Sequence, residues 1–251
     1  MRKASRYGLA AAIIFIALLS GIKTSYFPPE AVPAISPPAG GGHPSGFADA
    51  DGAFIEKSIP ASFSGKVVAL TFDDGPHPVV TKRILEVLER HNAKATFFMV
   101  GEHVQYYPDI VREVFRGGHE IGNHTWSHDN LEKLEIDEIE KEIAATNKAI
   151  QQIIGKRPSV FRPPYGLLAD SARRQISMQL AFWSVDTFDW EHKDAQLLLQ
   201  EVKNKVHDRA IILMHDIYPS TADGLEWVLQ HLESQGYTFV TVSELNSLDE
   251  K

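Results

Sequence analysis

The sequence predicts an α/β fold, namely a distorted (β/α) barrel of about seven units that forms a single catalytic domain. From about residue 66 onward, short apolar runs alternate with amphipathic stretches. About seven such units follow one another, and polar residues stand where the predicted strands end. Alternation of strands and helices produces a parallel sheet with helical crossovers, and this number of units can curl into a barrel.

The predicted elements follow in a regular order, with helical spacing of apolar residues in the helices and continuous apolar runs in the strands. The first half contains strand 67–72, helix 79–91, strand 95–100, helix 109–116, strand 120–123 and helix 136–154. The second half contains strand 160–162, helix 170–176, strand 181–186, helix 195–206, strand 210–215, helix 222–234 and strand 238–242.

Residues 1–27 are predicted to be a signal peptide or an N-terminal membrane anchor. Arg2, Lys3 and Arg6 precede an uncharged, largely apolar run over 7–22, which is the layout of an export signal. The run is shorter than the roughly 20 residues that span a bilayer comfortably, which favours cleavage. No convincing cleavage site follows directly, so the anchor remains an alternative. We expect an extracytoplasmic protein, either secreted or held at the cell surface.

Residues 28–62 are predicted to be a flexible tether that joins this segment to a catalytic domain over 63–251. The stretch is rich in Pro, Gly, Ala and Ser and has no apolar periodicity. Such a composition is typical of linkers without a core of their own.

Composition excludes several classes of chemistry and partner. The chain has no cysteine, so disulfides, thiolate catalysis and cysteine metal ligands are excluded, and any metal must be held by histidine and carboxylate. Residues 1–30 carry four basic groups and one acidic group, which leaves the rest of the chain at −11. We therefore expect no nucleic-acid partner, with membrane association confined to the N-terminal segment. We also expect a monomer.

Polar side chains stand at the end of five predicted strands. The carboxyl ends of parallel strands share one face of a barrel, which is where such folds place their active sites. We expect these five positions to converge there: Asp73-Asp74, Asn123-His124, Arg162, the segment 186–189 and His215.

Asp73 and Asp74 are adjacent carboxylates, and Gly75 and Pro76 force a turn directly after them. Burial of two neighbouring acids costs free energy unless a cation or a donor offsets it, so the pair indicates a metal ligand or a catalytic base. An Asx-turn at an ordinary loop is the alternative, which the pair alone does not exclude.

His124 and His128 are four residues apart, so their imidazoles meet on one face if the segment makes a helical turn. Two imidazoles and a carboxylate such as Asp74 form a catalytic divalent-metal site that leaves a position open. No glutamate follows His124, which excludes the zinc-protease helix. A pair of surface histidines is the alternative.

Arg162 is followed by two prolines, Tyr165 and Gly166, a stiff loop whose backbone N–H groups could bind a developing oxyanion. The alternative is a rigid turn with Arg162 in a surface ion pair.

His215 follows a buried apolar strand, where a neighbouring carboxylate could tune its pKa for acid catalysis. Asp186 and Asp189 are both candidates for that carboxylate, and spacing does not choose between them. Each of the three residues taken alone is also compatible with a structural role.

Together the five segments resemble the five motifs of the polysaccharide deacetylase family, carbohydrate esterase family 4, whose members share a domain with the rhizobial chitooligosaccharide deacetylase. The resemblance covers roughly residues 66–245 and keeps the family's motif order. It implies a distorted (β/α) barrel and one divalent metal ion, with zinc expected first and cobalt or another divalent ion as the alternative.

The resemblance implies that Asp74, His124 and His128 hold the metal. It also implies that Asp73 is the catalytic base and His215 the catalytic acid.

The same resemblance assigns supporting roles to five further residues. Asp189 would set the charge state of His215, since the family's tuning acid directly precedes a tryptophan, and Arg162 would orient Asp73. The Tyr165 N–H would help form the oxyanion site, and Trp190 and Leu213 would wall the pocket for the acetyl methyl.

The implied activity is metal-dependent hydrolysis of N-acetyl groups on a GlcNAc-containing polysaccharide, with release of acetate. The export signal and tether favour peptidoglycan as the substrate, with chitin oligomers as another candidate. Two alternatives stay open: an O-acetyl esterase acting on a xylan-type polysaccharide, and a non-catalytic protein that binds cell-wall carbohydrate.

Overall fold

The structure is a computed structural model that describes residues 65–249. The predicted signal or anchor over 1–27 and the tether over 28–62 lie outside the described residues, so these assignments and the domain boundary remain predictions. In the described part of the chain, no helix combines the length and the apolar character needed to cross a bilayer.

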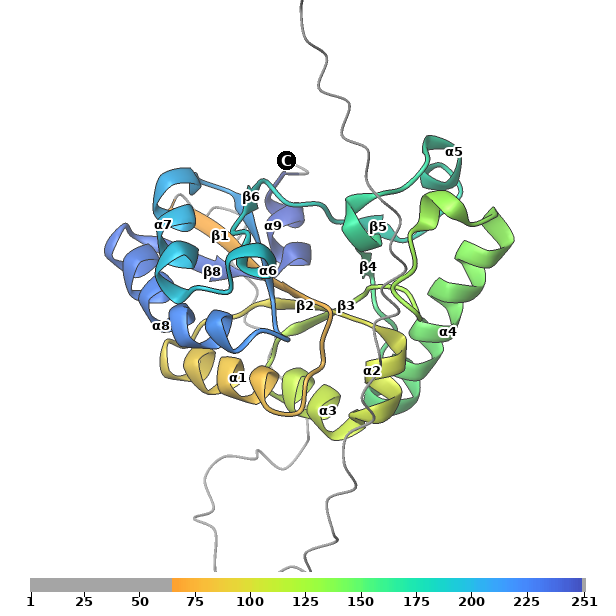
Figure 1. Cartoon of the computed structure of the whole chain (residues 1–251), viewed down its shortest axis with the longest axis horizontal. Helices are drawn as coiled ribbons and strands as arrows, with labels where there is room; N and C mark the ends of the chain where they lie inside the picture. The colour runs from red at the N-terminus through yellow and green to blue at the C-terminus, as the bar shows by residue number, and fades with distance from the viewer. Residues whose placement is uncertain (1–64, 250–251) are drawn as a thin grey trace, which may run out of the picture. The chain divides into compact units, whose positions relative to one another are not determined.

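The strands form one parallel sheet that curls into a distorted barrel (Figure 1), as the sequence predicts. The spatial order is β5-β4-β3-β2-β1-β7-β6, and β8 pairs with β1 as well. The strands are β1 (Lys66–Asp73), β2 (Thr96–Met99), β3 (Glu120–Asn123), β4 (Val160–Phe161), β5 (Gln179–Leu180), β6 (Val185–Asp186), β7 (Ala210–His215) and β8 (Tyr237–Val240).

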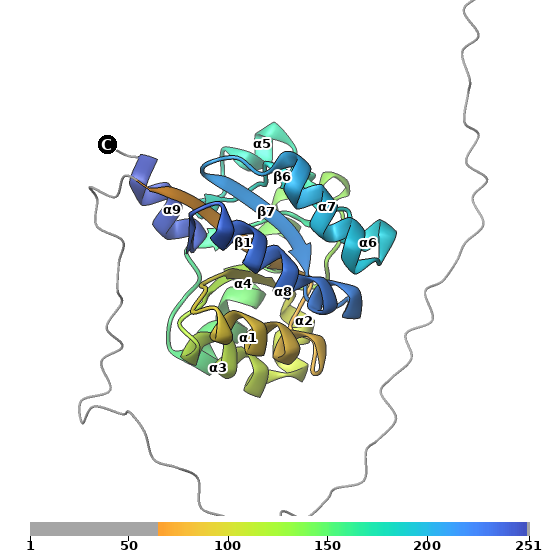
Figure 2. The ribbon, with the colours of Figure 1, turned by 90° about the vertical axis from the view of Figure 1, so that its left-hand side faces the viewer.

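Helices connect the strands, and Figure 2 shows α1, α7 and α8 on one side of the sheet. They pack on its outer face through one large apolar cluster. The helices are α1 (Val80–Arg90), α2 (Gly101–Tyr106), α3 (Pro108–Arg116), α4 (Ile136–Ile154), α5 (Asp170–Arg173), α6 (Asp189–His192), α7 (Ala195–Lys205), α8 (Pro219–Ser234) and α9 (Val242–Asp249). The sequence did not predict the short helices α2 and α6, or α9.

The predicted strand over 181–186 is wrong. Strand β5 ends at Leu180, just before this range, and the two-residue strand β6 lies at its end; the two strands stand at opposite ends of the strand order. Between them the Arg162 side chain donates to the carbonyl oxygens of Ala181 at 2.9 Å and of Phe182 at 3.4 Å. Backbone carbonyls must find a partner when they are buried, and here a guanidinium replaces a neighbouring strand.

Helix α9 replaces the end of the predicted strand over 238–242. Its residues Val242 and Leu245 pack with Val67 and Val240 in the apolar cluster on the inner face of the barrel. The Val242 N–H donates to Thr96 Oγ1 at 2.9 Å, which fixes the start of the helix against β2. The inner core thus closes one end of the barrel, and the other end holds polar side chains.

Strand β1 is buried along almost its whole length, and its side chains alternate between the two faces. Leu70 and Phe72 join the outer core beneath the helices, whereas Ala69 joins the inner cluster. Thr71 and Asp73 follow Ala69 in the same alternation, so both point into the barrel.

Register brings the polar strand ends together. Asp73 is paired with His215 on β7 and with Phe98 on β2. Asn123 at the end of β3 is paired with Phe161, the residue before Arg162. The five positions predicted to converge therefore lie at one end of the barrel.

Candidate metal and proton-transfer site

Asp73 is anchored by Arg162 at the centre of the site. The Arg162 Nη1 donates to Asp73 Oδ1 and to Thr71 Oγ1, both at 2.8 Å. Thr71 in turn donates to the carbonyl oxygen of Ile212 at 2.7 Å. One carboxylate oxygen of Asp73 is thereby fixed, and the other lies 3.7 Å from His124 Nε2.

Arg162 is wholly buried, which excludes the surface ion pair considered from the sequence. Its guanidinium carbon lies 4.1 Å from the centre of the Phe98 ring, and its nitrogens bond to Asp73, Thr71 and two carbonyl oxygens. A buried cation is tolerated when it is paired and hydrogen-bonded in this way. The side chain can therefore orient Asp73 with little freedom.

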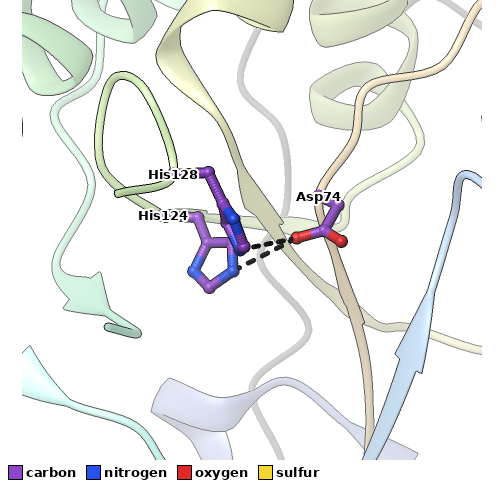
Figure 3. Close-up of side chains that lie close together, drawn as sticks. All are labelled: Asp74, His124 and His128. Atoms are coloured by element: carbon purple, nitrogen blue, oxygen red, sulfur yellow. Dashed lines mark ion pairs between the residues drawn. The ribbon is translucent and has the colours of Figure 1, made fainter. Parts of the chain in front are cut away.

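Asp74, His124 and His128 lie together, and Figure 3 shows both imidazoles directed at one oxygen of Asp74. His124 Nε2 lies 3.4 Å and His128 Nε2 3.2 Å from Asp74 Oδ1. The three ligand atoms lie within 4.8 Å of one another. Asp74 Oδ1 is buried and accepts no hydrogen bond from the described residues.

The segment from His124 to His128 is not a helical turn, in contrast to the geometry considered from the sequence. Thr125 and His128 have φ values of 66° and 60°, in the left-handed region, and the two imidazole rings lie 4.9 Å apart. Side-chain acceptors outside the segment hold this strained loop. Asn123 Oδ1 accepts from the Thr125 N–H at 2.8 Å. Glu142 Oε2 on α4 accepts from the N–H groups of Trp126 and Ser127, at 2.9 and 2.8 Å.

The donor set fits a divalent ion. His124 Nδ1 donates to the carbonyl oxygen of Arg162 at 2.7 Å, so Nε2 is the nitrogen left for a ligand bond. His103 Nδ1 donates to the carbonyl oxygen of Asp74 at 2.7 Å and holds the turn that carries the carboxylate. Two imidazoles and one carboxylate, whose buried Oδ1 accepts no hydrogen bond from the described residues, match a catalytic site with an open position.

Electrostatics favour an ionised Asp74. Burial raises the pKa of Asp74, but the imidazoles of His124 and His128 outweigh this effect and hold the pKa well below its usual range. The carboxylate is consequently available to a cation at neutral pH.

His215 and Asp189 form a second, self-contained pair. His215 Nδ1 donates to Asp189 Oδ1 at 2.7 Å, and the His215 backbone N–H donates to Oδ2 at 2.8 Å. Asp189 also accepts from Thr221 Oγ1 at 2.7 Å and from the Trp190 N–H at 3.0 Å. The ring orientation of His215 is therefore fixed, with Nε2 left for another partner.

The structure decides between the two candidate acids. Asp186 Oδ1 accepts from the Phe188 N–H at 2.8 Å in a local turn, whereas Asp189 contacts His215. Burial lowers the pKa of His215, but the hydrogen bond to Asp189 and the negative charges of Asp189, Asp74 and Asp73 raise it to about 9. The imidazole is thus protonated at neutral pH.

The remaining predicted site residues lie around this centre. Tyr165 has a φ of 60° in the turn Pro164–Gly166, and its ring lies 4.8 Å from the ring of His128. Leu213 is buried on β7, two residues before His215, and Trp190 is 44% exposed. The assigned roles of the Tyr165 N–H, Trp190 and Leu213 remain predictions.

Four supporting residues were missed by sequence reasoning: Thr71, His103, Glu142 and Thr221. Thr71 could have been found, because it lies two positions before Asp73 on one strand face. The other three lie on helices α2, α4 and α8 and carry no local signal.

Comparisons with known proteins agree with this geometry. The family model for polysaccharide deacetylases matches residues 61–182. Peptidoglycan-N-acetylmuramic acid deacetylase PdaC of Bacillus subtilis is 43% identical over 73% of this chain, but the chain spans only 39% of that protein's length. A peptidoglycan-N-acetylglucosamine deacetylase of Bacillus cereus is 37% identical over 76% of this chain and 74% of its own length.

Solved structures show the same fold. The structure of PdaC matches with a TM-score of 0.72 and 42% identity, covering 74% of this chain and 93% of the other. A pseudoenzyme of the CE4 family from Bacillus anthracis matches with a TM-score of 0.69 and 34% identity, covering 75% of this chain and 67% of the other.

Proposed function

The chain belongs to the polysaccharide deacetylase family, and we propose that it hydrolyses N-acetyl groups on an acetylated polysaccharide and releases acetate. One observation carries the proposal. Asp73 and His215 are register partners on neighbouring strands, and the group Asp74, His124 and His128 lies beside Asp73. A proton acceptor, a proton donor and a cation site thus lie close together at one end of the barrel, which is the set of groups that amide hydrolysis uses.

In the proposed reaction Asp73 removes a proton from the attacking water, with its carboxylate oriented by Arg162. The Tyr165 N–H helps to bind the oxyanion that forms on the acetamide carbonyl. His215 then donates its Nε2 proton to the leaving nitrogen, and Asp189 holds the ring in the required tautomer. Trp190 and Leu213 enclose the acetyl methyl group.

Asp74, His124 and His128 would hold the divalent ion, which we propose is zinc. When bound, such an ion supplies Lewis acidity to the carbonyl and acidifies the attacking water. The nitrogen-rich, three-ligand set supports zinc, because magnesium and calcium prefer oxygen ligands. Cobalt would fit the same ligands, and metal analysis of the purified protein together with reconstitution of the chelated protein distinguishes the two.

Turnover is favoured over a purely carbohydrate-binding role. A relative of the same fold is described as a pseudoenzyme, so the family does include proteins that are not active. A binding protein is expected to lose a ligand or the base, whereas both aspartates, both histidines and the His215–Asp189 pair are in place here.

We propose peptidoglycan as the substrate, with the N-acetyl group of GlcNAc as the target. Both curated relatives described above are named as peptidoglycan deacetylases, one of N-acetylmuramic acid and one of N-acetylglucosamine. The N-terminal sequence, in which basic residues precede an apolar run and a Pro/Gly-rich stretch follows, is typical of exported proteins and supports a cell-wall substrate.

Acetate release from purified peptidoglycan, chitin oligomers and acetylated xylan, each with and without a chelator, tests the proposal. We expect chelator-sensitive release from peptidoglycan, and mass spectrometry of the digested product locates the free amine on GlcNAc or on muramic acid. Release from xylan alone would support the O-acetyl esterase instead, since an alcohol leaves with less help from His215 than an amine. No release from any substrate would support the binding protein.

We further propose that the protein is exported and remains at or outside the cell membrane. The basic residues before an apolar run support this location. Cell fractionation and N-terminal sequencing of the mature protein test it. A mature chain that begins after residue 22 indicates a cleaved signal, an intact N-terminus in the membrane fraction indicates an anchor, and protein found in the cytoplasm contradicts export.

A further inference from the structure

Asp216 is a buried carboxyl group that the proposed reaction does not use. It directly follows His215 and has no exposed surface. Its backbone N–H donates to the carbonyl oxygen of Asp73 at 3.2 Å. Its Oδ2 accepts from Thr81 Oγ1 at 2.5 Å, and its Oδ1 has no hydrogen-bond partner among the described residues.

The carboxylate lies directly against the turn that carries Asp74. A Cβ atom added at Gly75 would come within 2.1 Å of Asp216 Oδ2, so glycine is required there by close contact. Thr81 Oγ1, which donates to Asp216, also accepts from the His77 N–H at 2.8 Å. Asp216 therefore lies directly against Gly75 and is linked to His77 through Thr81, so it supports the turn over residues 74–77 from both sides.

The charge of this carboxylate has no permanent counterion in the described structure. Arg162 is committed to Asp73, and the one side-chain hydrogen bond to Asp216 comes from a neutral hydroxyl. Burial raises the pKa of Asp216 to about 7; the Thr81 hydroxyl opposes this shift, and the negative charges of Asp74 and Asp73 add to it. A buried charge costs free energy unless a cation or donors offset it.

We propose that Asp216 is a positioning residue of the cation site, whose buried carboxylate holds the turn over residues 74–77 and strengthens cation binding by Asp74, His124 and His128. The inference rests on the metal site proposed above. Groups behind the ligands commonly orient them and contribute to metal affinity, and Asp216 contacts the residue next to a ligand.

A purely structural role makes the opposite prediction. Thr81 lies in the first turn of α1, and a carboxylate near the N-terminus of a helix stabilises the helix. If Asp216 served only as this anchor, its replacement by asparagine would lower the stability of the metal-free protein and leave cation affinity unchanged. If Asp216 serves the cation site, asparagine removes a negative charge that destabilises the metal-free protein and attracts the bound cation. The metal-free protein should then become more stable, and cation affinity should fall.

The test compares Asp216→Asn with wild type in the full chain. We expect zinc affinity, measured by competition with a chromophoric chelator, to fall by roughly 10- to 100-fold. At about pH 8, where the Asp216 carboxyl with its raised pKa of about 7 is mostly charged, the melting temperature of the chelator-treated variant should rise. Asp223→Asn is the matched control, because it removes one carboxylate from the exposed face of α8 and should leave zinc affinity unchanged.

Unchanged zinc affinity in Asp216→Asn would overturn the proposal, as would an equal loss in the Asp223 control. Wild-type protein that binds no zinc or cobalt would instead remove the metal site itself, which distinguishes the two failures. If Asp216→Asn does not fold, Thr81→Val tests the same contact, because it keeps the charge but frees the carboxylate. We expect weaker zinc binding from that variant too, and unchanged binding would contradict the proposal.

Discussion

The two halves of the site differ in how many hydrogen bonds the protein itself supplies to their buried carboxylates. Asp189 accepts four hydrogen bonds and fixes the ring of His215, so this half of the site needs no added ligand to hold its geometry. On the other half Asp74 Oδ1 is buried without a hydrogen bond, and the loop that carries His128 is held in left-handed backbone conformations. Buried polar atoms without partners and strained backbone concentrate where a ligand completes the structure.

The difference teaches that the two halves should respond to different perturbations. The half formed by Asp74, His124 and His128 should depend on a cation, whereas the His215–Asp189 pair should persist without one. Five predictions test or sharpen this contrast.

Removal of the divalent ion, or Asp74→Ala, should have the largest effect. We expect acetate release to fall by on the order of 10³-fold or more, because an ion contributes several kcal/mol of charge stabilisation to the transition state. The downfield NMR signal of the His215 Nδ1 proton should survive chelation, since its acceptor is Asp189. Loss of that signal on chelation would break the contrast, and restored activity on adding zinc to wild type is the control.

Asp73→Asn should lower kcat by a factor on the order of 10²–10⁴, the typical contribution of general-base catalysis. Asparagine can keep the bond from Arg162 but cannot take a proton. Zinc stoichiometry, measured by metal analysis, should stay at one ion per chain. Near wild-type turnover in this variant would remove Asp73 from the role of base.

Asp189→Asn should shift the pH profile, because Asp189 raises the pKa of His215. His215 must be protonated to act as an acid, so kcat/KM of the wild type should fall as pH rises through about 9. In the variant this basic limb should move to lower pH, with activity at neutral pH reduced by about 10- to 100-fold. Asp186→Asn is the matched control, since Asp186 bonds to Phe188 N and its replacement should leave the limb in place.

The His215–Asp189 pair should also make the free energy of unfolding depend on pH in a predictable direction. The pKa of His215 is raised from 6.5 to about 9 in the folded state. Its contribution to stability is therefore complete below about pH 6.5 and is lost as pH rises to about 9. Urea unfolding at several pH values should show this loss in wild type and a smaller loss in Asp189→Asn.

Glu142→Ala should have the smallest effect on activity and a measurable effect on stability. Glu142 accepts from the N–H groups of Trp126 and Ser127, and its removal leaves both without that acceptor. We expect a loss of about 1–3 kcal/mol in the free energy of unfolding and weaker zinc binding through His128. Glu140→Ala, on the same helix but exposed, should change neither quantity, and equal effects from both variants would contradict the proposed support of the loop.

Much of the architecture could be predicted, because the spacing of apolar residues within each short segment indicates whether it forms a strand or a helix. The alternation of strands and helices predicted the barrel, and the polar residues after apolar runs predicted which positions converge. Helix α4 and strands β3 and β7 have the predicted bounds, since each has a clear apolar pattern between turn residues. The short elements were missed because helix α6 and strands β5 and β6 are too brief to show a period.

The sequence by itself determined which residues could form the site, because side-chain alternation and the shared end of parallel strands follow from the chain's local geometry. Only the tertiary structure decided that Asp189 rather than Asp186 contacts His215, and that the two histidines meet through a left-handed loop. It also revealed Asp216 beneath Gly75, with a partner 135 positions away in the chain at Thr81. Such contacts join residues from different strands and helices, and packing of the whole barrel sets their distances, which no local pattern encodes.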